Sequence, residues 1–365
     1  MYDDFISRGN EVSYQLYRRL FDSQNIAFGI PSSDECNQCL SYQKHEKDID
    51  SSQHDSTNCE LCCQFQAHIT KATNARKKYR KDIKLPNVFC VDMQQVIIIP
   101  KLTTKEAFFT SRLVCFNETF ASGKSGEKDY AVVWHEGIKG RKAGDVASSY
   151  VKFLGEVGEK FPIFWTDNCA GQNKNWLLFT AMVSVVNSPW GPEDVTIKYL
   201  ESGHTFMAAD SIHGVIGKKM RACPEIISFK DLTNLVENSS KKTTVVNMNV
   251  NDFYDFKAGQ RARNSRKVQI PKLCDIVEVK FVKESRLMYF KCTHDTNEYE
   301  GVDFLKPRYP LTPFPEQIRV PRGITSKKKQ GILRILGHVD ALKRKFYDEL
   351  FVNDQVEDLV SEFDQ

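Results

Sequence analysis

The sequence predicts an α/β protein whose centre is a mixed five-stranded sheet flanked by helices. Residues 87–100, 112–121 and 130–137 are predicted to form three successive strands, the first two of which are rich in β-branched and aromatic residues. Beyond residue 140, apolar runs of helix length alternate with shorter runs of strand length. Alternation of this kind is typical of a packed α/β domain.

The later elements follow in a regular order. We expect strands at 162–167 and 195–202, and helices at 144–161, 175–186 and 210–222. Three strands, a helix, a strand, a helix, a strand and a helix is the element order of an RNase H-like fold. The sequence therefore predicts an RNase H-like domain over residues 86–237.

Two further regions flank this domain. Residues 1–85 begin with a predicted helix over 3–27, whose apolar face carries Val12, Leu16, Leu20 and Phe21, and continue with a cysteine-rich zinc-knuckle segment and a basic helix from about Cys62 to Lys81. Residues 238–365 form a small, basic C-terminal α+β region. It contains an alternating run at 275–294 that predicts a hairpin, and terminal helices over 326–350.

Composition narrows the class of protein. Hydrophobic residues make up 41% and charged residues 27% of the 365 residues, which is typical of a globular chain. No run approaches the roughly 18 apolar residues of a membrane helix, and the first ten residues do not resemble a signal peptide. We therefore expect no membrane partner and a reducing compartment, in which clustered cysteines hold metal.

Three aspartates lie where the predicted fold brings them together. Asp92 lies in the first strand, Asp167 ends the fourth, and Asp210 begins the helix after the fifth. Three carboxylates at one end of a sheet are able to hold two Mg²⁺ ions roughly 3.5–4 Å apart. Such ions activate an attacking oxygen and stabilise the leaving oxygen of a phosphodiester. The alternative for Asp167 and the amides after it is helix capping.

Three motif blocks, "VDMQQVIIIPKL", "WTDNCAGQNKNW" and "ESGHTFMAADSIHGVI", resemble a large family of transposon-derived proteins in animal genomes. That family is grouped with the DDE transposases and integrases, which have an RNase H-like core. The similarity runs from Tyr2 to about Leu350 and includes "DECNQC" upstream and "KKKQGILRIL…FYDEL" downstream. The DNCAGQNKN block is its most specific part.

The resemblance implies that Asp92, Asp167 and Asp210 are the metal ligands, with Glu201 as the rival for the third place. It further implies Mg²⁺ or Mn²⁺ as the catalytic ions and DNA as the partner, which places the protein in the nucleus. A homo-oligomer is compatible with this interpretation. The residues expected to support the acids or contact DNA are Asn168, Gln172, Asn173 and His204.

The cysteine-rich segment predicts a structural zinc site. Cys36-x2-Cys39 and Cys59-x2-Cys62 are separated by nineteen residues, close to the spacing of tetrahedral zinc sites. The fourth ligand is open, because other side chains nearby have suitable chemistry. These alternatives are His45, His54, Cys63 and His68.

Basic runs predict contact with a polyanion. Residues 256–274 hold six Lys or Arg and no acid, and residues 71–81 hold another six. Such runs are more often solvated faces, but several in one chain favour nucleic acid. The residues expected to contact DNA phosphates are Arg261, Arg263, Arg266, Lys267, Lys327, Lys328 and Lys329.

The sequence thus predicts a DDE-type, two-metal nuclease and strand transferase acting on DNA. Two other interpretations remain. One is a domesticated, non-catalytic nucleic-acid-binding protein that keeps the fold. The other is an RNase H-like nuclease that cuts RNA or RNA–DNA hybrids.

Overall fold

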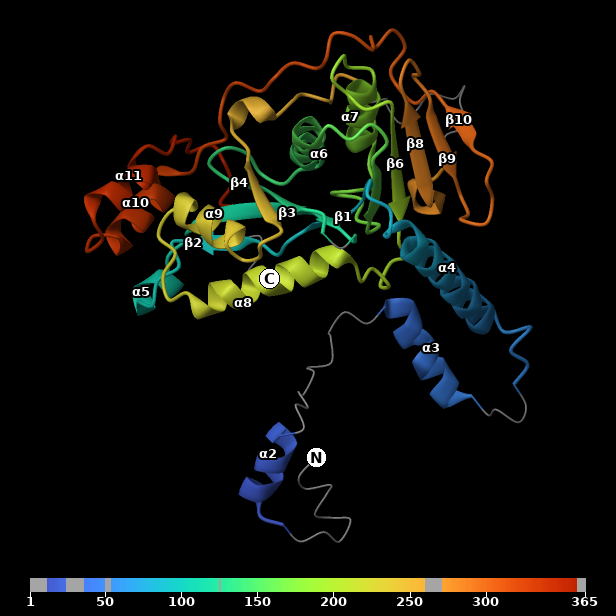
Figure 1. The fold of residues 1–365 in the computed structure, drawn as a ribbon, viewed down its shortest axis with the longest axis horizontal. Coiled ribbons are helices and arrows are strands. Elements are labelled where there is room, and N and C mark those ends of the chain that lie inside the picture. Colours follow the sequence, from blue (N-terminus) through green and yellow to red (C-terminus); the bar gives the residue numbers. More distant parts are fainter. Residues whose placement is uncertain (1–11, 24–35, 50–53, 125, 260–270, 360–365) are drawn as a thin grey trace. The chain divides into compact units, whose positions relative to one another are not determined.

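A computed structural model describes residues 12–23, 36–49, 54–124, 126–259 and 271–359 (Figure 1). The chain divides into two compact units, Met1–Cys62 and Cys63–Gln365. Within the described ranges, no helix is both long enough and apolar enough to cross a membrane.

Two short helices lie within the described residues of the first unit. Helix α2 covers Tyr14–Ser23 and α3 covers Asn37–Asp48. The helix predicted over 3–27 is therefore observed in its middle part, while residues 3–11 and 24–27 lie outside the described residues. Leu16, expected on its apolar face, is exposed.

The second unit is built on one sheet of ten strands among the described residues, instead of the five predicted. Its order is β10-β9-β8-β6-β5-β1-β3-β4-β7, and β2 pairs with β3 beside this path. The strands are β1 (Val88–Met93), β2 (Ile97–Ile99), β3 (Leu113–Ser122), β4 (Asp129–His135), β5 (Ile163–Thr166), β6 (Asp194–Tyr199), β7 (Thr243–Asn247), β8 (Glu278–Val282), β9 (Met288–Lys291) and β10 (Glu300–Val302).

Strand directions make the sheet mixed. In its middle, β1 is antiparallel to β3 and parallel to β5, while β6 continues parallel to β5. β4 is antiparallel to β3, and β7 pairs parallel with β4 at one edge. The predicted hairpin is confirmed as β8 and β9, which extend the sheet antiparallel to β6.

The added strands satisfy backbone groups that β4 and β6 would otherwise leave unpaired at the sheet edges. The regions predicted as residues 86–237 and 238–365 therefore share one sheet.

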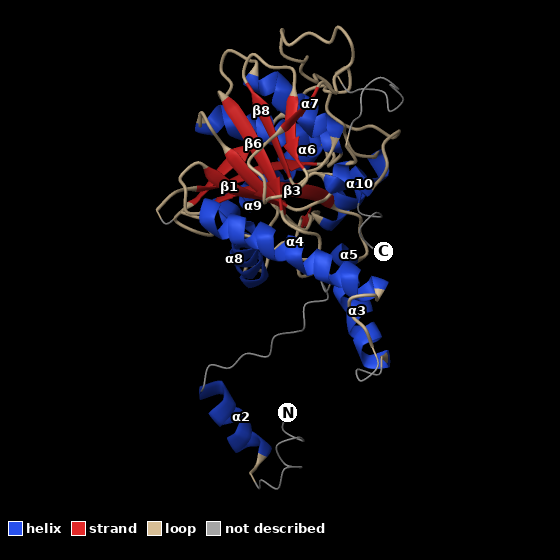
Figure 2. Cartoon of the chain, turned by 90° about the vertical axis from the view of Figure 1, so that its right-hand side faces the viewer, coloured by secondary structure: helices blue, strands red, loops and turns tan. Residues whose placement is uncertain are grey.

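Helices cover both faces of this sheet (Figures 1 and 2). On one face lie α6 and α7, and on the other lie α4 and α8. The helix bounds are α4 (Glu60–Asp82), α5 (Lys105–Phe108), α6 (Ala143–Val157), α7 (Trp176–Val186), α8 (Ala208–Ala222), α9 (Phe229–Glu237), α10 (Ser326–Ile335) and α11 (Ala341–Asp348), with 3-10 turns at Val250–Asp252 and Leu273–Asp275.

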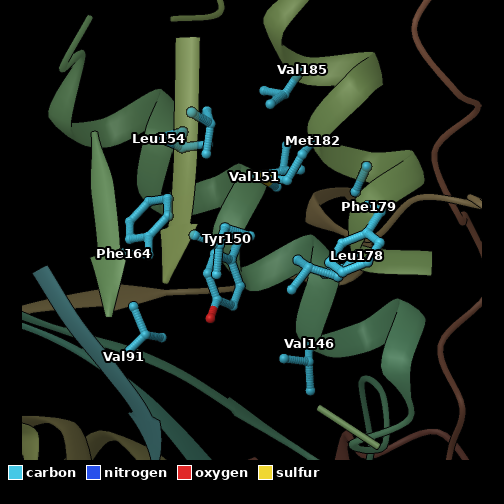
Figure 3. Packing of buried hydrophobic residues seen from close by; sticks show 14 of the residues in the cluster. Val91, Val146, Tyr150, Val151, Leu154, Phe164, Leu178, Phe179, Met182 and Val185 are labelled. Carbon is cyan, nitrogen blue, oxygen red and sulfur yellow. The ribbon is translucent and has the colours of Figure 1, made fainter. Parts of the chain in front are cut away.

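Strand β1 contributes apolar side chains to both faces of the sheet. Side chains of a strand alternate between the two sides of a sheet. Phe89 and Val91 enter the core under α6 and α7, whereas Val88 and Cys90 pack toward α4 and α8. Figure 3 shows the first of these cores, in which Tyr150 and Phe164 lie near Val91. By the same alternation, Asp92 follows Val88 and Cys90 onto the α4 and α8 side.

The predicted basic helix is confirmed as α4, and one of its stripes is buried. His68, Ala72, Ala75 and Tyr79 recur at helical spacing and are all buried. At the end of the helix, Asp82 Oδ2 accepts hydrogen bonds from Lys198 Nζ at 2.7 Å and from Trp165 Nε1 at 3.2 Å. These contacts fix α4 on β5 and β6.

Candidate active site and metal centres

Asp92 and Asp167 come together through the register of two parallel strands. β1 pairs with β5 from Val88↔Ile163 to Val91↔Thr166. One step further along this ladder, Asp92 and Asp167 are opposite each other. Neighbouring strands are separated by about 4.8 Å, so the two carboxylates share one edge of the sheet. This edge is the carboxyl end of both strands, where α/β proteins commonly place their ligand sites.

Helix α8 brings two further side chains to the same edge. Ligand atoms of Asp92, Asp210 and His213 all lie within 4.8 Å of one another. Asp210 and His213 are three residues apart on α8 and share a face of that helix. His213 Nδ1 lies 3.7 Å from Asp92 Oδ2, and its Nε2 lies 3.0 Å from Thr119 Oγ1. Asp167 does not belong to this closest group.

The electrostatics of this edge favour a cation. The pKa of Asp92 is raised to about 7, chiefly by burial and then by the nearby carboxylates of Asp167 and Asp210. Burial also lowers the pKa of His213 to about 4, so this imidazole is neutral at neutral pH and gives Asp92 no ion pair. A divalent ion would relieve the repulsion among the carboxylates.

The amides of the DNCAGQNKN block hold Asp167 in place. Asp167 Oδ1 accepts hydrogen bonds from Asn173 Nδ2 at 2.8 Å and from the Cys169 backbone N–H at 3.0 Å. Asn173 is itself buried, and its Oδ1 accepts a hydrogen bond from Tyr150 Oη at 3.0 Å. Asn173 therefore orients the acid but is too buried to contact DNA.

The neighbouring amides have structural partners as well. Asn168 Oδ1 accepts a hydrogen bond from Lys174 Nζ at 2.7 Å, and Asn168 Nδ2 donates to the Leu200 carbonyl. Gln172 Nε2 lies 3.8 Å from Met93 Sδ. The helix cap weighed as the alternative is also present, but Asn175 supplies it, through its Oδ1 and the Leu178 backbone N–H at 2.9 Å.

Glu201 and His204 face His68 of α4. Glu201 Oε1 lies 3.2 Å from His68 Nδ1, and His204 Nε2 lies 3.0 Å from His68 Nε2. Glu201, the rival for the third acid, therefore lies with these histidines and not in the group of Asp92, Asp210 and His213.

One acid at this edge escaped the sequence analysis. Glu118 is fully buried in β3, opposite Met93, so it lies on the other face of the sheet from Asp92. Burial, with the charges of Asp92 and Asp167, raises the pKa of Glu118 well above its usual range. Neither of its carboxylate oxygens has a hydrogen-bond partner among the described residues. Its polar position inside an apolar strand run was the only signal available.

The first unit gathers a group of side chains with the chemistry to hold a metal ion. Ligand atoms of His45, His54, Cys59 and Cys62 lie within 4.8 Å of one another. Cys59 Sγ is 3.3 Å from His45 Nε2, and Cys62 Sγ is 3.2 Å from His54 Nε2. Two of the predicted cysteines are thus present, joined by two of the histidines weighed as alternatives.

Cys36 and Cys39 do not belong to this group, which corrects the four-cysteine set predicted from spacing. Cys36 is the N-cap of α3 and Cys39 lies in its first turn, whereas His45 lies in the last turn. With a rise of 1.5 Å per residue, six residues separate Cys39 from His45 by about 9 Å along the helix. Both cysteines are therefore too far along α3 to share this site.

The basic residues predicted to contact DNA differ in their environments. Arg261, Arg263, Arg266 and Lys267 lie outside the described residues. Lys328 is buried, and its Nζ contacts Glu136 Oε1 and, at 2.8 Å, Asp358 Oδ1, so its prediction as a DNA contact is wrong. Lys329 Nζ donates to the carbonyls of Asp348 and Leu350 at the end of α11. Lys327 is exposed.

A groove on α4 presents basic side chains instead. It is lined by Arg76, Lys77, Arg80, His204 and Phe206, among others. Lys77 and Arg80 are exposed, as is the aromatic side chain of Phe206. Phe206 lies four residues before Asp210, so the groove lies next to the segment that leads into the acidic edge.

Comparison with known proteins adds one match. Residues 162–295 match a family described as a domain of unknown function (DUF7869). The match covers less than half of the chain and contains Asp167, Asp210 and His213, but it excludes Asp92 and Glu118. No curated protein and no solved structure matches the chain.

Proposed function

We propose that this protein is a metal-dependent nuclease and strand transferase that acts on DNA phosphodiesters, as a transposon-derived relative of the DDE enzymes. The observation that carries the proposal is the convergence of Asp92, Asp167 and Asp210 at one sheet edge. The order and directions of the middle strands, β4-β3-β1-β5-β6, support an RNase H-like core.

The residues at this edge fit divalent metal. Carboxylate oxygens are the ligands that Mg²⁺ and Mn²⁺ prefer, and the imidazole of His213 is compatible with Mn²⁺. When bound, the ions supply activation of the attacking oxygen and stabilisation of the leaving oxygen. Asn173 holds Asp167 through its amide, and Thr119 holds the ring of His213.

The α4 groove offers a path for the DNA backbone beside these acids. Lys77 and Arg80 supply positive charge that attracts phosphates without reading sequence. The exposed ring of Phe206 offers a surface on which an unpaired base is able to stack. Such a protein would act in the nucleus.

A structural zinc ion in the first unit completes the proposal. His45, His54, Cys59 and Cys62 form a Cys₂His₂ set, which is typical of tetrahedral zinc. A bound ion would stabilise a segment that has little apolar core of its own. Its role would be to hold α3 against the start of α4.

The second candidate is a non-catalytic nucleic-acid-binding protein. The hydrogen bonding of Asp210 favours it, because Asp210 Oδ2 accepts from the Met207 backbone N–H at 2.7 Å as part of a capping box. An acid used to cap a helix is sufficiently explained without catalysis. The two candidates differ in whether phosphodiesters are cut.

A cleavage assay with cognate transposon ends and Mg²⁺ or Mn²⁺ separates them. We expect nicking or joining by the wild type and none by Asp167→Asn, because the amide keeps the shape of the carboxylate but removes the charge that holds the cation. DNA binding should persist in that variant. Equal cleavage by both proteins would refute the assignment, and binding without cleavage by either would favour the second candidate. Cleavage confined to RNA or hybrid substrates would indicate an RNase H-like nuclease.

A further inference from the structure

Two imidazoles converge away from the acidic edge. His68 lies on the buried stripe of α4, and His204 lies in the segment between β6 and α8. Their Nε2 atoms are 3.0 Å apart, and the two rings are inclined by 53°. His68 is only 5% exposed, and His204 is half-buried.

Glu201 fixes the tautomer of His68. Its Oε1 lies 3.2 Å from His68 Nδ1, where a carboxylate accepts the ring N–H. The lone pair of His68 then lies on Nε2 and points toward His204. Metal-binding histidines almost always donate their other ring N–H to a carboxylate, a carbonyl or water, and this orientation raises their basicity.

The spacing of the two nitrogens suits a shared ion. Zinc binds imidazole nitrogen at about 2.0–2.1 Å, so two ligands on a tetrahedral ion are about 3.4 Å apart. The 3.0 Å observed here is close to that value. A simple N–H···N hydrogen bond is the competing explanation, and it requires His204 to carry its proton on Nε2.

Other contacts tie the same segment to α4. Arg76 Nη2 donates to the His204 carbonyl at 3.0 Å, and Tyr79 Oη accepts from the Ala208 backbone N–H at 3.1 Å. The segment leads directly into α8, which carries Asp210. An ion at His68 and His204 would therefore fix the approach to the acidic edge.

We propose that His68 and His204 are ligands of a second structural zinc ion, with Glu201 as the residue that positions His68. This site is distinct from the group at His45, His54, Cys59 and Cys62, and it does not depend on whether the acids catalyse. A tetrahedral ion has two further positions, and a cobalt spectrum distinguishes thiolate from water in them.

Zinc content of the purified, reduced full chain tests this proposal. We expect two zinc ions per wild-type chain and one in His204→Gln, whose amide is able to hydrogen-bond but binds zinc poorly. His204→Cys should restore the second ion, because a thiolate is a zinc ligand. Cys59→Ser should remove the other ion only. His338→Gln, at an exposed position of the described chain, is the matched control and should keep both.

A second measurement guards against variants that fail to fold. Glu201→Gln should weaken binding of one zinc ion by about 10–100-fold in competition with a chelator, while leaving the other unchanged. Undiminished zinc content in His204→Gln, or unchanged affinity in Glu201→Gln, would overturn the proposal in favour of the hydrogen bond. A single zinc ion in the wild type, lost in Cys59→Ser, would do the same.

Discussion

At the scale of single residues, side chains with unusual environments decide what the site is able to do. Ionisation of Asp92 is unfavourable, because its carboxyl group is partly buried and lies near two other carboxylates. Glu118 lies deeper and has no partner among the described residues. These two acids lie on opposite faces of the sheet: Asp92 is on the side covered by α8, and Glu118 is on the side covered by α6. We infer that Asp92 binds metal, whereas burial holds the pKa of Glu118 well above its usual range inside the core.

His135 gives the protein a sensitivity to acid that is separate from the site. It is buried between Phe229 and Phe346, and burial lowers its pKa to about 4. The unfolded chain therefore binds a proton at pH values where the folded chain does not. The stability that follows is fully present above about pH 6.5 and is lost as the pH falls toward 4.

Replacing this side chain should reduce the acid sensitivity. In His135→Leu, the loss of unfolding free energy between pH 7 and pH 4 should be smaller than in the wild type by up to about 3 kcal/mol. Urea titrations at a series of pH values measure the difference. His338→Leu, at an exposed position, should behave like the wild type. Parallel pH profiles for His135→Leu and the wild type would contradict the burial argument.

At the scale of elements, the sequence and the structure agree where patterning is strong. Most of the strands and helices between β1 and α8 were predictable because apolar runs of two distinct lengths alternate there, but the single strand predicted over 87–100 is divided into β1 and β2, and α5 was not predicted. The parallel register of β1 and β5 brings Asp92 and Asp167 together. The extra strands β7 and β8–β10 were not assigned to this sheet, because a hairpin pattern does not say which edge it will join.

The sequence pattern was least informative about which side chains of a helix face the core. Consecutive residues of a helix point about 100° apart, so the basic run Lys327, Lys328 and Lys329 could not reveal that its middle member faces inward. His213 was likewise overlooked, although its spacing from Asp210 places both on one face. The four-cysteine set was predicted from spacing, which does not reveal that His45 on α3 and His54 in the following loop lie beside Cys59 and Cys62.

The buried charges around Lys328 hold α10 in place. Lys328 contacts Glu136 and Asp358, and Arg322 Nη1 lies 3.4 Å from Glu136 Oε2. Lys328→Ala should lower the free energy of unfolding by about 3–5 kcal/mol, because it leaves Glu136 buried without its closest partner. Chemical denaturation measures this. Lys327→Ala, one residue earlier and exposed, should change stability by no more than about 0.5 kcal/mol. Similar losses in both variants would argue against the ion pairs.

At the scale of the whole molecule, the groove and the acidic edge belong to one proposed path for DNA. Log affinity for duplex DNA should fall with log salt, with a slope of about 0.9 per neutralised phosphate. The double variant Lys77→Ala/Arg80→Ala should reduce the slope by about 0.9 for each of the two phosphate contacts that it removes. Fluorescence anisotropy at several salt concentrations measures it, with the exposed Lys345→Ala as the control. An unchanged slope would mean that this face of α4 is merely solvated.

The central claim is that the acids at the sheet edge hold divalent metal. Counting bound Mn²⁺ by electron paramagnetic resonance tests it without any substrate. We expect two ions in the wild type, and strongly weakened binding in both Asp92→Asn and Asp167→Asn, because each removes a charge from the shared site. Glu118→Gln, on the other face of the sheet, should bind Mn²⁺ as the wild type does. Wild-type Mn²⁺ binding in Asp92→Asn and Asp167→Asn, or none in the native chain, would contradict the account.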